Sequence, residues 1–251
     1  MTTTSKGRFR DYELALAAFK VREYEKAANI CRGAAVALEK NECFDDAAVA
    51  YDLLGTANYR LGLAAEAKSC YLKSLELSEL AGSTPSREYT KALNSLAAAA
   101  NALGEHAEAV NWLGKALSLS ERHQAREETV STFHQLGVVE SSRQNLEEAR
   151  RWFRKAIAAA DAKYDIERIV ASVRWLASTM TDQYDPEEVD RVYAIATDAM
   201  EAAGGVVHAQ NAAEQARREF DFRASTEFYR KAFEMASRRG QENVSGTSGT
   251  A

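Results

Sequence analysis

Residues 47–77 read AAVAYDLLGTANYRLGLAAEAKSCYLKSLEL and define the unit from which this chain is built. The stretch contains two helical patterns that are separated at Gly62. Leu54 in the first pattern and Ala67 in the second are apolar or small where two helices must touch, and Gly55 allows their backbones to approach closely. The stretch therefore predicts a pair of closely packed antiparallel helices.

The same pattern recurs along nearly the whole chain. Taking Ala67 as an anchor, equivalent positions follow at intervals of 36 to 42 residues, at Ala27, Ala67, Ala109, Ala149, Val189 and Ser225. Apolar or small residues stand 13 and 12 positions before each anchor, at Leu14-Ala15, Leu54-Gly55, Leu96-Ala97, Leu136-Gly137, Leu176-Ala177 and Ala212-Ala213. Larger residues stand four positions after it, at Cys31, Tyr71, Leu113, Phe153, Tyr193 and Tyr229. Six matches in register predict six helix pairs.

This pattern resembles the tetratricopeptide repeat, which has Leu-Gly in its first helix and Ala, an aromatic residue and another Ala in its second. The interval of about 40 residues exceeds the commonest repeat length of about 34, so we expect helices longer by a turn or longer loops. The resemblance implies an all-α fold, a right-handed superhelical α-solenoid of antiparallel helix pairs, in which each pair packs against the next.

We expect a single TPR-like solenoid domain over residues 8–239, between a disordered N-terminus at 1–7 and a disordered tail at 240–251. Gly62 and Gly104 have the positions of glycines that follow helix ends. Thr84-Pro85 and Asp185-Pro186 resemble an N-cap followed by a proline at the first helical position. The predicted repeats are 8–41, 44–82, 84–122, 125–163, 165–203 and 205–239.

Composition narrows the class of protein. The chain has 32 Lys and Arg against 37 Asp and Glu, a net charge of −5, and nucleic-acid-binding proteins normally show a basic excess. It contains no apolar run long enough to cross a membrane, and its first residues lack the apolar core of a secretory signal. Cys31, Cys43 and Cys70 cannot all pair with one another and match no zinc spacing. We expect a cytoplasmic protein with neither a nucleic-acid nor a membrane partner.

The sequence shows no catalytic constellation. Its histidines, at positions 106, 123, 134 and 208, are scattered and form no His/Cys or HExxH pattern. Neither GxGxxG nor a GK[ST] loop occurs, and acidic residues such as Glu147 and Glu148 fall on helix faces expected to be solvated. We therefore predict a non-enzymatic protein without a cofactor or a metal site.

The resemblance also implies a binding surface, because the first helices of tetratricopeptide repeats line a concave groove. Positions 18, 15, 11, 8 and 7 residues before each anchor share one side of these helices. They carry six Lys or Arg against three Asp or Glu, which favours an acidic partner, although so small a difference could also arise by accident. The candidate ligand-binding residues are Tyr12, Phe19, Lys20, Asp52, Tyr59, Arg60, Lys91, Asn94, Asn101, His134, Arg174, Gln210, Arg217 and Arg218.

Two kinds of contact are expected from these residues. The amides of Asn94 and Asn101 offer both a donor and an acceptor to the backbone of an extended peptide. The rings of Tyr12, Phe19 and Tyr59 offer a stacking surface for an apolar side chain. The alternative is that the aromatic residues of the first repeat only cover the end of the solenoid.

Three functions fit the sequence. The first is an adaptor or scaffold that binds a peptide or a partner helix in the concave groove. The second is a self-assembling or complex-building subunit that acts through its terminal repeats or its convex face, with Phe228, Phe233 and Met235 as an end-docking patch for a homo-oligomer. The third is a peptide-sensing regulator without a DNA-binding domain of its own. The identity of the partner is left open.

Overall fold

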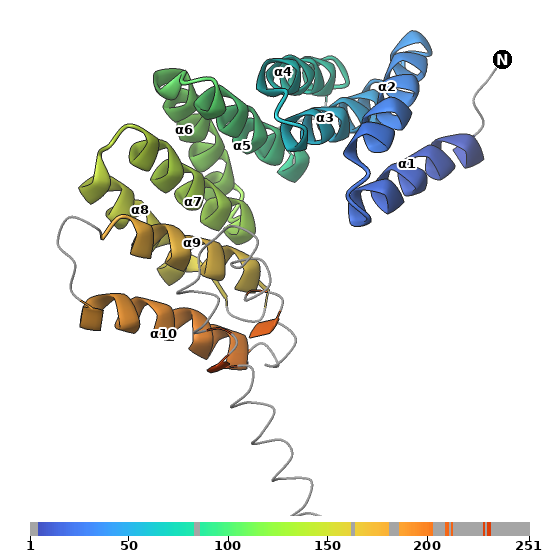
Figure 1. The fold of residues 1–251 in the computed structure, drawn as a ribbon. Helices are drawn as coiled ribbons and strands as arrows, with labels where there is room; N and C mark the ends of the chain where they lie inside the picture. The colour runs from blue at the N-terminus through green and yellow to red at the C-terminus, as the bar shows by residue number, and fades with distance from the viewer. Residues whose placement is uncertain are drawn as a thin grey trace, which may run out of the picture. The chain divides into compact units, whose positions relative to one another are not determined.

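A computed structural model describes residues 5–82, 86–161, 164–180 and 186–202, with residues 209, 210, 212, 228, 230 and 231; residues 5–10 and 186–190 are described by their backbone alone. This part of the chain contains helices and short links but no strand, which confirms the all-α class (Figure 1). The helices are α1 (Ser5–Lys20), α2 (Tyr24–Lys40), α3 (Phe44–Arg60), α4 (Ala64–Leu80), α5 (Arg87–Ala102), α6 (His106–Arg122), α7 (Arg126–Ser142), α8 (Leu146–Ala159), α9 (Ile166–Ser178) and α10 (Pro186–Ala202).

The chain divides into two compact units, which we call unit 1 (Met1–Arg143) and unit 2 (Gln144–Ala251). In unit 1 each helix from α1 to α7 packs against the next, and in unit 2 α8 packs against α9 and α9 against α10. Helix α1 begins at Ser5, within the segment 1–7 that we expected to be disordered. Most of the sixth predicted repeat and the tail lie outside the described residues, so the single domain over 8–239 stays a prediction.

One kind of link joins most of these helices. The α1–α2, α2–α3, α3–α4, α5–α6, α6–α7 and α7–α8 links each contain three residues. The middle residue has a left-handed backbone with positive φ, and the third residue begins the next helix as its N-cap. Within unit 1 such links reverse the chain direction, as an antiparallel helix pair requires. The left-handed positions in these links are Arg22, Glu42, Gly62, Gly104, Gln124 and Gln144.

Backbone hydrogen bonds close these links. The N–H of Glu23 donates to the carbonyl oxygen of Ala18 at 2.9 Å, and the N–H of Leu63 donates to that of Asn58 at 2.9 Å. These bonds span the end of the preceding helix in the manner of a Schellman motif. Gly62 and Gly104, with φ of 80° and 79°, occupy the C′ position as predicted, because glycine takes this conformation without a Cβ clash.

The long repeat interval comes from the helices. Helices α2, α3, α4, α6 and α7 each contain 17 residues, whereas the links inside the pairs of unit 1 contain three. The α4–α5 link is longer and includes residues 83–85, which are not described; Thr84 and Pro85 are among them. The N-cap of α5 is Ser86, whose Oγ accepts a hydrogen bond from the N–H of Tyr89 at 3.2 Å.

The predicted anchors form the interior. Ala27, Ala67, Ala109 and Ala149 are completely buried, so their small side chains lie where neighbouring helices meet. Leu54 packs against residues of α1 and α2, which shows that this position contacts the preceding helix pair. Leu14 has the equivalent position in α1 but is exposed, contrary to the pattern, because no described helix precedes α1 to cover it.

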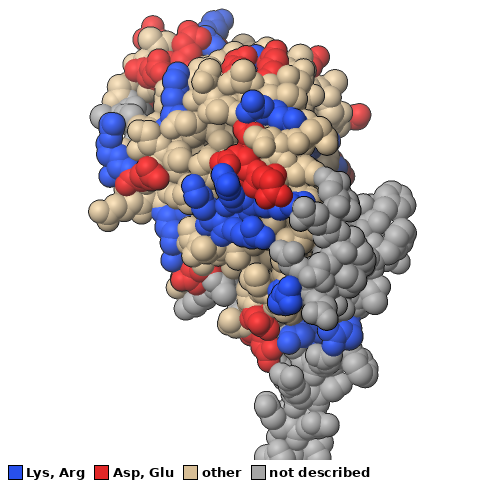
Figure 2. All heavy atoms as spheres, turned by 90° about the vertical axis from the view of Figure 1, so that its left-hand side faces the viewer, with Lys and Arg blue, Asp and Glu red and all other residues tan. Residues whose placement is uncertain are grey.

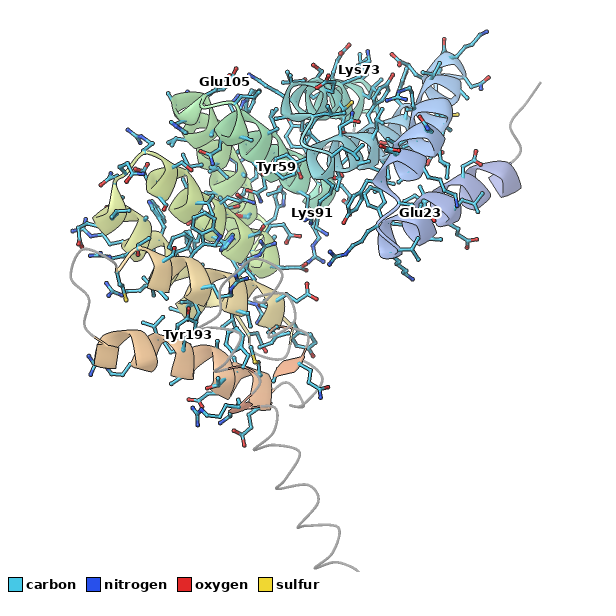
Figure 3. All side chains as sticks on the ribbon, in the orientation of Figure 1. Glu23, Tyr59, Lys73, Lys91, Glu105 and Tyr193 are labelled. Carbon is cyan, nitrogen blue, oxygen red and sulfur yellow. The ribbon has the colours of Figure 1, made fainter. Side chains whose placement is uncertain are left out.

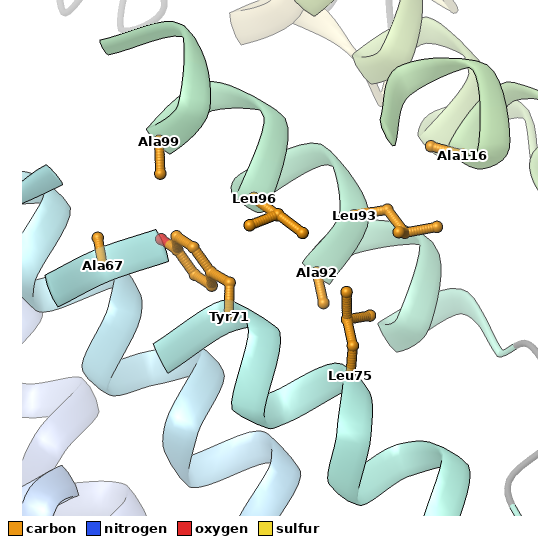
Figure 4. Packing of buried hydrophobic residues seen from close by; sticks show 8 residues of the cluster. All are labelled: Ala67, Tyr71, Leu75, Ala92, Leu93, Leu96, Ala99 and Ala116. Atoms are coloured by element: carbon orange, nitrogen blue, oxygen red, sulfur yellow. The ribbon is translucent and has the colours of Figure 1, made fainter. Parts of the chain in front are cut away.

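The core between α4 and α5 illustrates the packing between pairs (Figure 4). The ring of Tyr71 and the side chain of Leu75 on α4 face Ala92 and Leu96 on α5. Full burial of a leucine side chain contributes roughly 1.5–3 kcal/mol. Such contacts stabilise each pair against its neighbour, so apolar burial extends from pair to pair within unit 1.

Ion pairs between second helices support this apolar packing. Lys68 of α4 lies 2.5 Å from Glu105 and 2.7 Å from Glu108 at the start of α6. Lys73 of α4 lies 2.9 Å from Glu39 of α2. Figure 2 shows a surface on which Lys and Arg side chains lie among Asp and Glu side chains. Ion pairs that solvent can reach contribute about 1 kcal/mol or less, so these half-buried pairs are secondary to apolar burial.

Gly55 makes a close contact within the α3–α4 pair. A Cβ added at this position would lie 2.6 Å from Cε1 of Tyr71, whose ring is buried. Glycine is therefore required here by the aromatic ring of the facing helix, as the sequence suggested. Gly33 and Gly114 also lie inside helices, but a Cβ at either would meet nothing within 4 Å.

We predict that Gly55→Ala lowers the free energy of unfolding by about 1–3 kcal/mol, because the new methyl group would force the buried Tyr71 ring to shift. Urea denaturation followed by circular dichroism measures this change. The controls Gly33→Ala and Gly114→Ala should each raise the free energy of unfolding by about 0.5–1 kcal/mol, since alanine favours the helix. A Gly55→Ala protein as stable as the Gly33→Ala protein would contradict the proposed role of the ring.

Candidate functional site

The first helices of unit 1 present one surface, which we call the first-helix face. It consists of the exposed sides of α1, α3, α5 and α7, and α5 contacts both α3 and α7. In Figure 3, Tyr59 and Lys91 lie on one side of unit 1. Lys73 of the second helix α4 and Glu105, the N-cap of the second helix α6, lie at the opposite edge. The sequence places its candidate groove residues in unit 1 on this face.

Several candidate residues on this face are exposed. Tyr12 of α1 and Tyr59 of α3 are 44% and 38% exposed, so both rings are accessible to a ligand. Lys20, Arg60 and Lys91 are also exposed. Phe19 is half-buried, and its ring lies 6.0 Å from that of Tyr24, so it contributes to the core between α1 and α2.

Two candidate residues are buried instead. Asn94 is 5% exposed and His134 is 6% exposed, so the structure does not support them as surface contacts for a peptide. The amide oxygen of Asn94 accepts a hydrogen bond from Thr132 Oγ1 at 3.0 Å, which links α5 to α7. The Asn94 amide nitrogen has no partner among the described residues. The helical offset identified the correct side of α5 but could not show that α7 covers it.

Asn101 stands at the end of α5 with its amide already engaged. Its Nδ2 donates to Ser142 Oγ of α7 at 3.1 Å, and its Oδ1 lies 2.8 Å from His106 Nδ1. Asn101 is nevertheless half-exposed, so a ligand can reach it by replacing one of these contacts. The three side chains form a polar group at one end of the first-helix face.

A buried carboxylate joins the other ends of α5 and α7. Glu128 of α7 is 2% exposed and is paired with Arg87 of α5, and Lys91 lies 4.0 Å from its Oε1. Arg87 also pairs with Glu127. Because a buried charge without a partner is costly, these cations hold α5 and α7 together. The sequence pattern did not single out Glu128, whose burial depends on the approach of α5.

Asp52 lies on α3 beneath the first-helix face. Its Oδ1 is buried and has no hydrogen-bond partner among the described residues. Burial raises the pKa of Asp52 to about 6, and the positive charge of Lys91 opposes that rise. Asp52 therefore changes its charge in mildly acidic solution.

An apolar cleft of about 400 Å³ opens at the α1 end of unit 1. Its lining comes from α1, α2 and α3 and includes Tyr12 and Val49, both exposed, together with Leu53. Asp11 and Asp46 also line it. The sequence named Tyr12 as a groove residue, and its offset of 18 residues before Ala67 gives Val49 the same side. It did not predict the cleft, because periodicity does not show how far apart helices lie.

The candidates in unit 2 are less completely described. Arg174 of α9 is half-buried and Gln210 is exposed, whereas Arg217, Arg218, Phe233 and Met235 lie outside the described residues. Phe228 is completely buried, with its ring 5.9 Å from that of Tyr193. Its prediction as an exposed docking residue is therefore wrong, because Tyr193 of α10 covers it.

The described residues give no sign of a metal or membrane site. No group of three or more His, Cys, Asp or Glu side chains in this part of the chain is arranged to hold a metal ion. Among the described helices none is long and apolar enough to cross a membrane. The cytoplasmic location and the absence of a nucleic-acid partner stay predictions.

Comparison with known proteins identifies the repeats. The tetratricopeptide repeat model matches residues 45–122 and 88–162. No curated protein matches the chain. Residues 45–162 therefore contain tetratricopeptide repeats, as their helix pairs and buried small residues indicate.

Solved structures show the same fold. A Rap protein in complex with competence and sporulation factor is similar, with a TM-score of 0.68 and 13% identity over 96% of this chain and 78% of that one. The Rap conjugation gene regulator of plasmid pLS20 in complex with the Phr* peptide has a TM-score of 0.65 and 14% identity, over 96% of this chain and 78% of that one. The repeats of a putative kinesin light chain of Podosopora anserina have a TM-score of 0.62 and 16% identity, over 80% of this chain and 97% of that one. These similarities confirm the α-solenoid fold.

The buried position of Asp52 predicts a pH-dependent stability. Below about pH 4 the carboxyl is protonated in both the folded and the unfolded chain, because its unfolded pKa is about 3.9. As the pH rises toward 6 the unfolded chain ionises first, so the folded state loses stability, and above pH 6 the full loss remains. Asp52→Asn should therefore raise the free energy of unfolding by about 1–3 kcal/mol at pH 7.5 and by little at pH 3.5.

Urea denaturation at the two pH values measures this difference. The control Glu13→Gln removes an exposed carboxylate of α1 and should not change the pH dependence. Equal stabilisation by Asp52→Asn at both pH values would show that desolvation of the charge is not the cause.

Proposed function

We propose that this protein is an adaptor whose first-helix face in unit 1 binds an extended segment of a partner protein. The observation that carries the proposal is the exposure of Tyr12, Val49 and Tyr59 on this one face. Neighbouring exposed apolar side chains on a soluble fold mark interaction surfaces. Aromatic side chains contribute large contact area at low entropic cost, so tyrosines are well suited to such a surface.

The charges on this face favour an acidic segment. Four of the predicted groove positions in unit 1 carry a charge. Three of these residues are exposed and basic, namely Lys20, Arg60 and Lys91, whereas the acidic Asp52 is largely shielded from solvent. Lys20 and Arg60 also stand in the last turns of their helices, where a cation complements the helix dipole. Lys91 lies 4.0 Å from Oε1 of the buried Glu128 and is itself exposed, so its ammonium group can also reach an anionic ligand.

Known uses of the fold support a peptide or protein as the ligand. The solved structure of the plasmid pLS20 Rap regulator, which has the same fold, is that of a complex with the Phr* peptide. Helix pairs arranged in this way can thus present a peptide-binding surface. A binding role without catalysis also agrees with the predominantly structural contacts of the titratable groups in unit 1, such as Glu128 with Arg87.

We predict that Tyr59→Ala combined with Lys91→Glu weakens peptide binding at least about tenfold, since loss of central aromatic and cationic contacts costs about 1–2 kcal/mol or more. Peptides would be selected on the whole protein from a random 12-residue phage library, and their affinities measured by fluorescence anisotropy. The selected peptides should be enriched in Asp and Glu.

The matched control is Val36→Ala combined with Lys40→Glu, which changes an exposed apolar residue and an exposed lysine on the second helix α2. This control should bind the peptides like the unaltered protein. If the control loses affinity and the Tyr59→Ala, Lys91→Glu protein does not, the second helices form the binding surface and the proposal fails.

A further inference from the structure

One side of α1 carries exposed apolar residues. The helix lies at one end of unit 1 and packs against α2 (Figure 1). Its Ala15 and Ala18 are buried, whereas Leu14, Ala17 and Val21 are exposed. The N–H of Val21 donates to the carbonyl oxygen of Ala17 at 3.3 Å, so Val21 continues the path of the helix. Positions i, i+3 and i+7 share one side of a helix, and we call these three exposed residues the α1 stripe.

The positions of the α1 stripe are buried in the later helix pairs. The residues 13 and 10 positions before the later anchors are Leu54 and Ala57, Leu96 and Ala99, Leu136 and Val139, and Leu176 and Thr179, all of them buried. Leu54 and Ala57, for example, pack in one cluster with Ala18 of the preceding pair. Leu14 and Ala17 stand at the same two offsets, yet Leu14 is 46% exposed and Ala17 is also exposed. The α1 stripe thus has the composition of a surface that joins one helix pair to another.

Two charged side chains flank the α1 stripe. Glu13 and Lys20 are both exposed, and a spacing of seven residues places them on the same side of the helix. Neither forms an ion pair with another residue in the described part of the chain. Along the helix axis Ala17 lies about 6 Å from Glu13 and about 4.5 Å from Lys20, because each residue advances about 1.5 Å. The flank therefore carries opposite charges at similar distances from Ala17.

We propose that the α1 stripe binds the α1 stripe of a second copy of this chain, with the two helices antiparallel. A two-fold axis then passes beside Ala17. Leu14 of each copy packs against Val21 of the other, and Glu13 of each copy pairs with Lys20 of the other. Such an isologous contact closes at two copies. A parallel arrangement would place Glu13 beside Glu13 and Lys20 beside Lys20, so repulsion between like charges disfavours it.

This contact is independent of the proposed adaptor function. Tyr12 stands two residues before Leu14, which places the two side chains on nearly opposite sides of α1. The first-helix face is therefore left open in the dimer. A contact of one helix per copy is small, so we expect a Kd on the order of 10–100 µM. At about 1 µM the chain is then monomeric, and stability measurements on its variants report on a single copy.

Sedimentation equilibrium of the whole chain between about 5 and 500 µM measures this association. The average mass should rise with concentration toward that of two copies. Leu14→Glu should weaken the association at least about tenfold, because it places a carboxylate against Val21 of the other copy. The matched control Leu80→Glu changes an exposed leucine of α4 and should associate like the unaltered protein.

Two results of this measurement would overturn the proposal. The first is a chain that stays monomeric at every concentration, which would leave the α1 stripe to a different partner. The second is a Leu14→Glu protein that associates like the Leu80→Glu control, which would show that the copies meet through another surface.

An exchange of charges tests the antiparallel direction. Glu13→Lys and Lys20→Glu should each weaken the association about threefold or more, since each alone brings like charges together. The two changes combined restore opposite charges and should return the Kd to within about twofold of the original value. A combined variant that associates no better than either single variant, with an unchanged helix content by circular dichroism, would overturn the antiparallel pairing.

The position of the two-fold axis can be tested by cross-linking. Ala17→Cys should form a disulfide-linked dimer when treated with oxidised glutathione, because the two introduced thiols face each other across the axis. The matched control is Ala65→Cys, which changes an exposed alanine of α4 and should stay monomeric on a non-reducing gel, as the unaltered protein should. A covalent dimer of Ala65→Cys without one of Ala17→Cys would place the contact on the second helices and overturn the proposal.

Discussion

The close approach of helices at small buried residues is the constraint on which this structure depends. Ala27, Ala67 and Ala109 are completely buried, and Gly55 lies directly against the ring of Tyr71. A larger side chain at any of these points would separate two helices, and each helix of unit 1 contacts the next. Displacement at one contact would therefore be transmitted to the neighbouring pair, since packed interiors do not deform continuously.

The uniform links preserve this packing from pair to pair. Because most links contain three residues around one left-handed position, each helix enters the next pair in a similar direction. The helices of unit 1, rather than its links, carry the additional length of the repeat. Longer helices bring more first-helix surface to one side, and Tyr12, Tyr59 and Lys91 occupy part of it. The first-helix face, which we propose as the binding surface, thus arises from the way in which the interior is packed.

At equivalent positions of the repeats, the candidate site contains both exposed and buried residues. Tyr12, Asp52 and Asn94 stand at the same offset before their anchors, yet Tyr12 is exposed, whereas Asp52 Oδ1 and the amide nitrogen of Asn94 are buried. The difference comes from neighbouring first helices, since α7 covers Asn94 through Thr132. At the α1 end the helices leave a cleft instead.

The sequence by itself determined the helix pairs, their register and their buried small residues, because these follow from local spacing and from the volume that a helix contact allows. It also indicated the C′ glycines at Gly62 and Gly104, whose conformation is a property of the residue type. Only the tertiary structure decided that Asn94 and Glu128 are buried, that Phe228 is covered by Tyr193, and that a cleft opens beside Tyr12. These outcomes depend on the distances between helices far apart in the chain, and the periodicity of one helix carries no information about them.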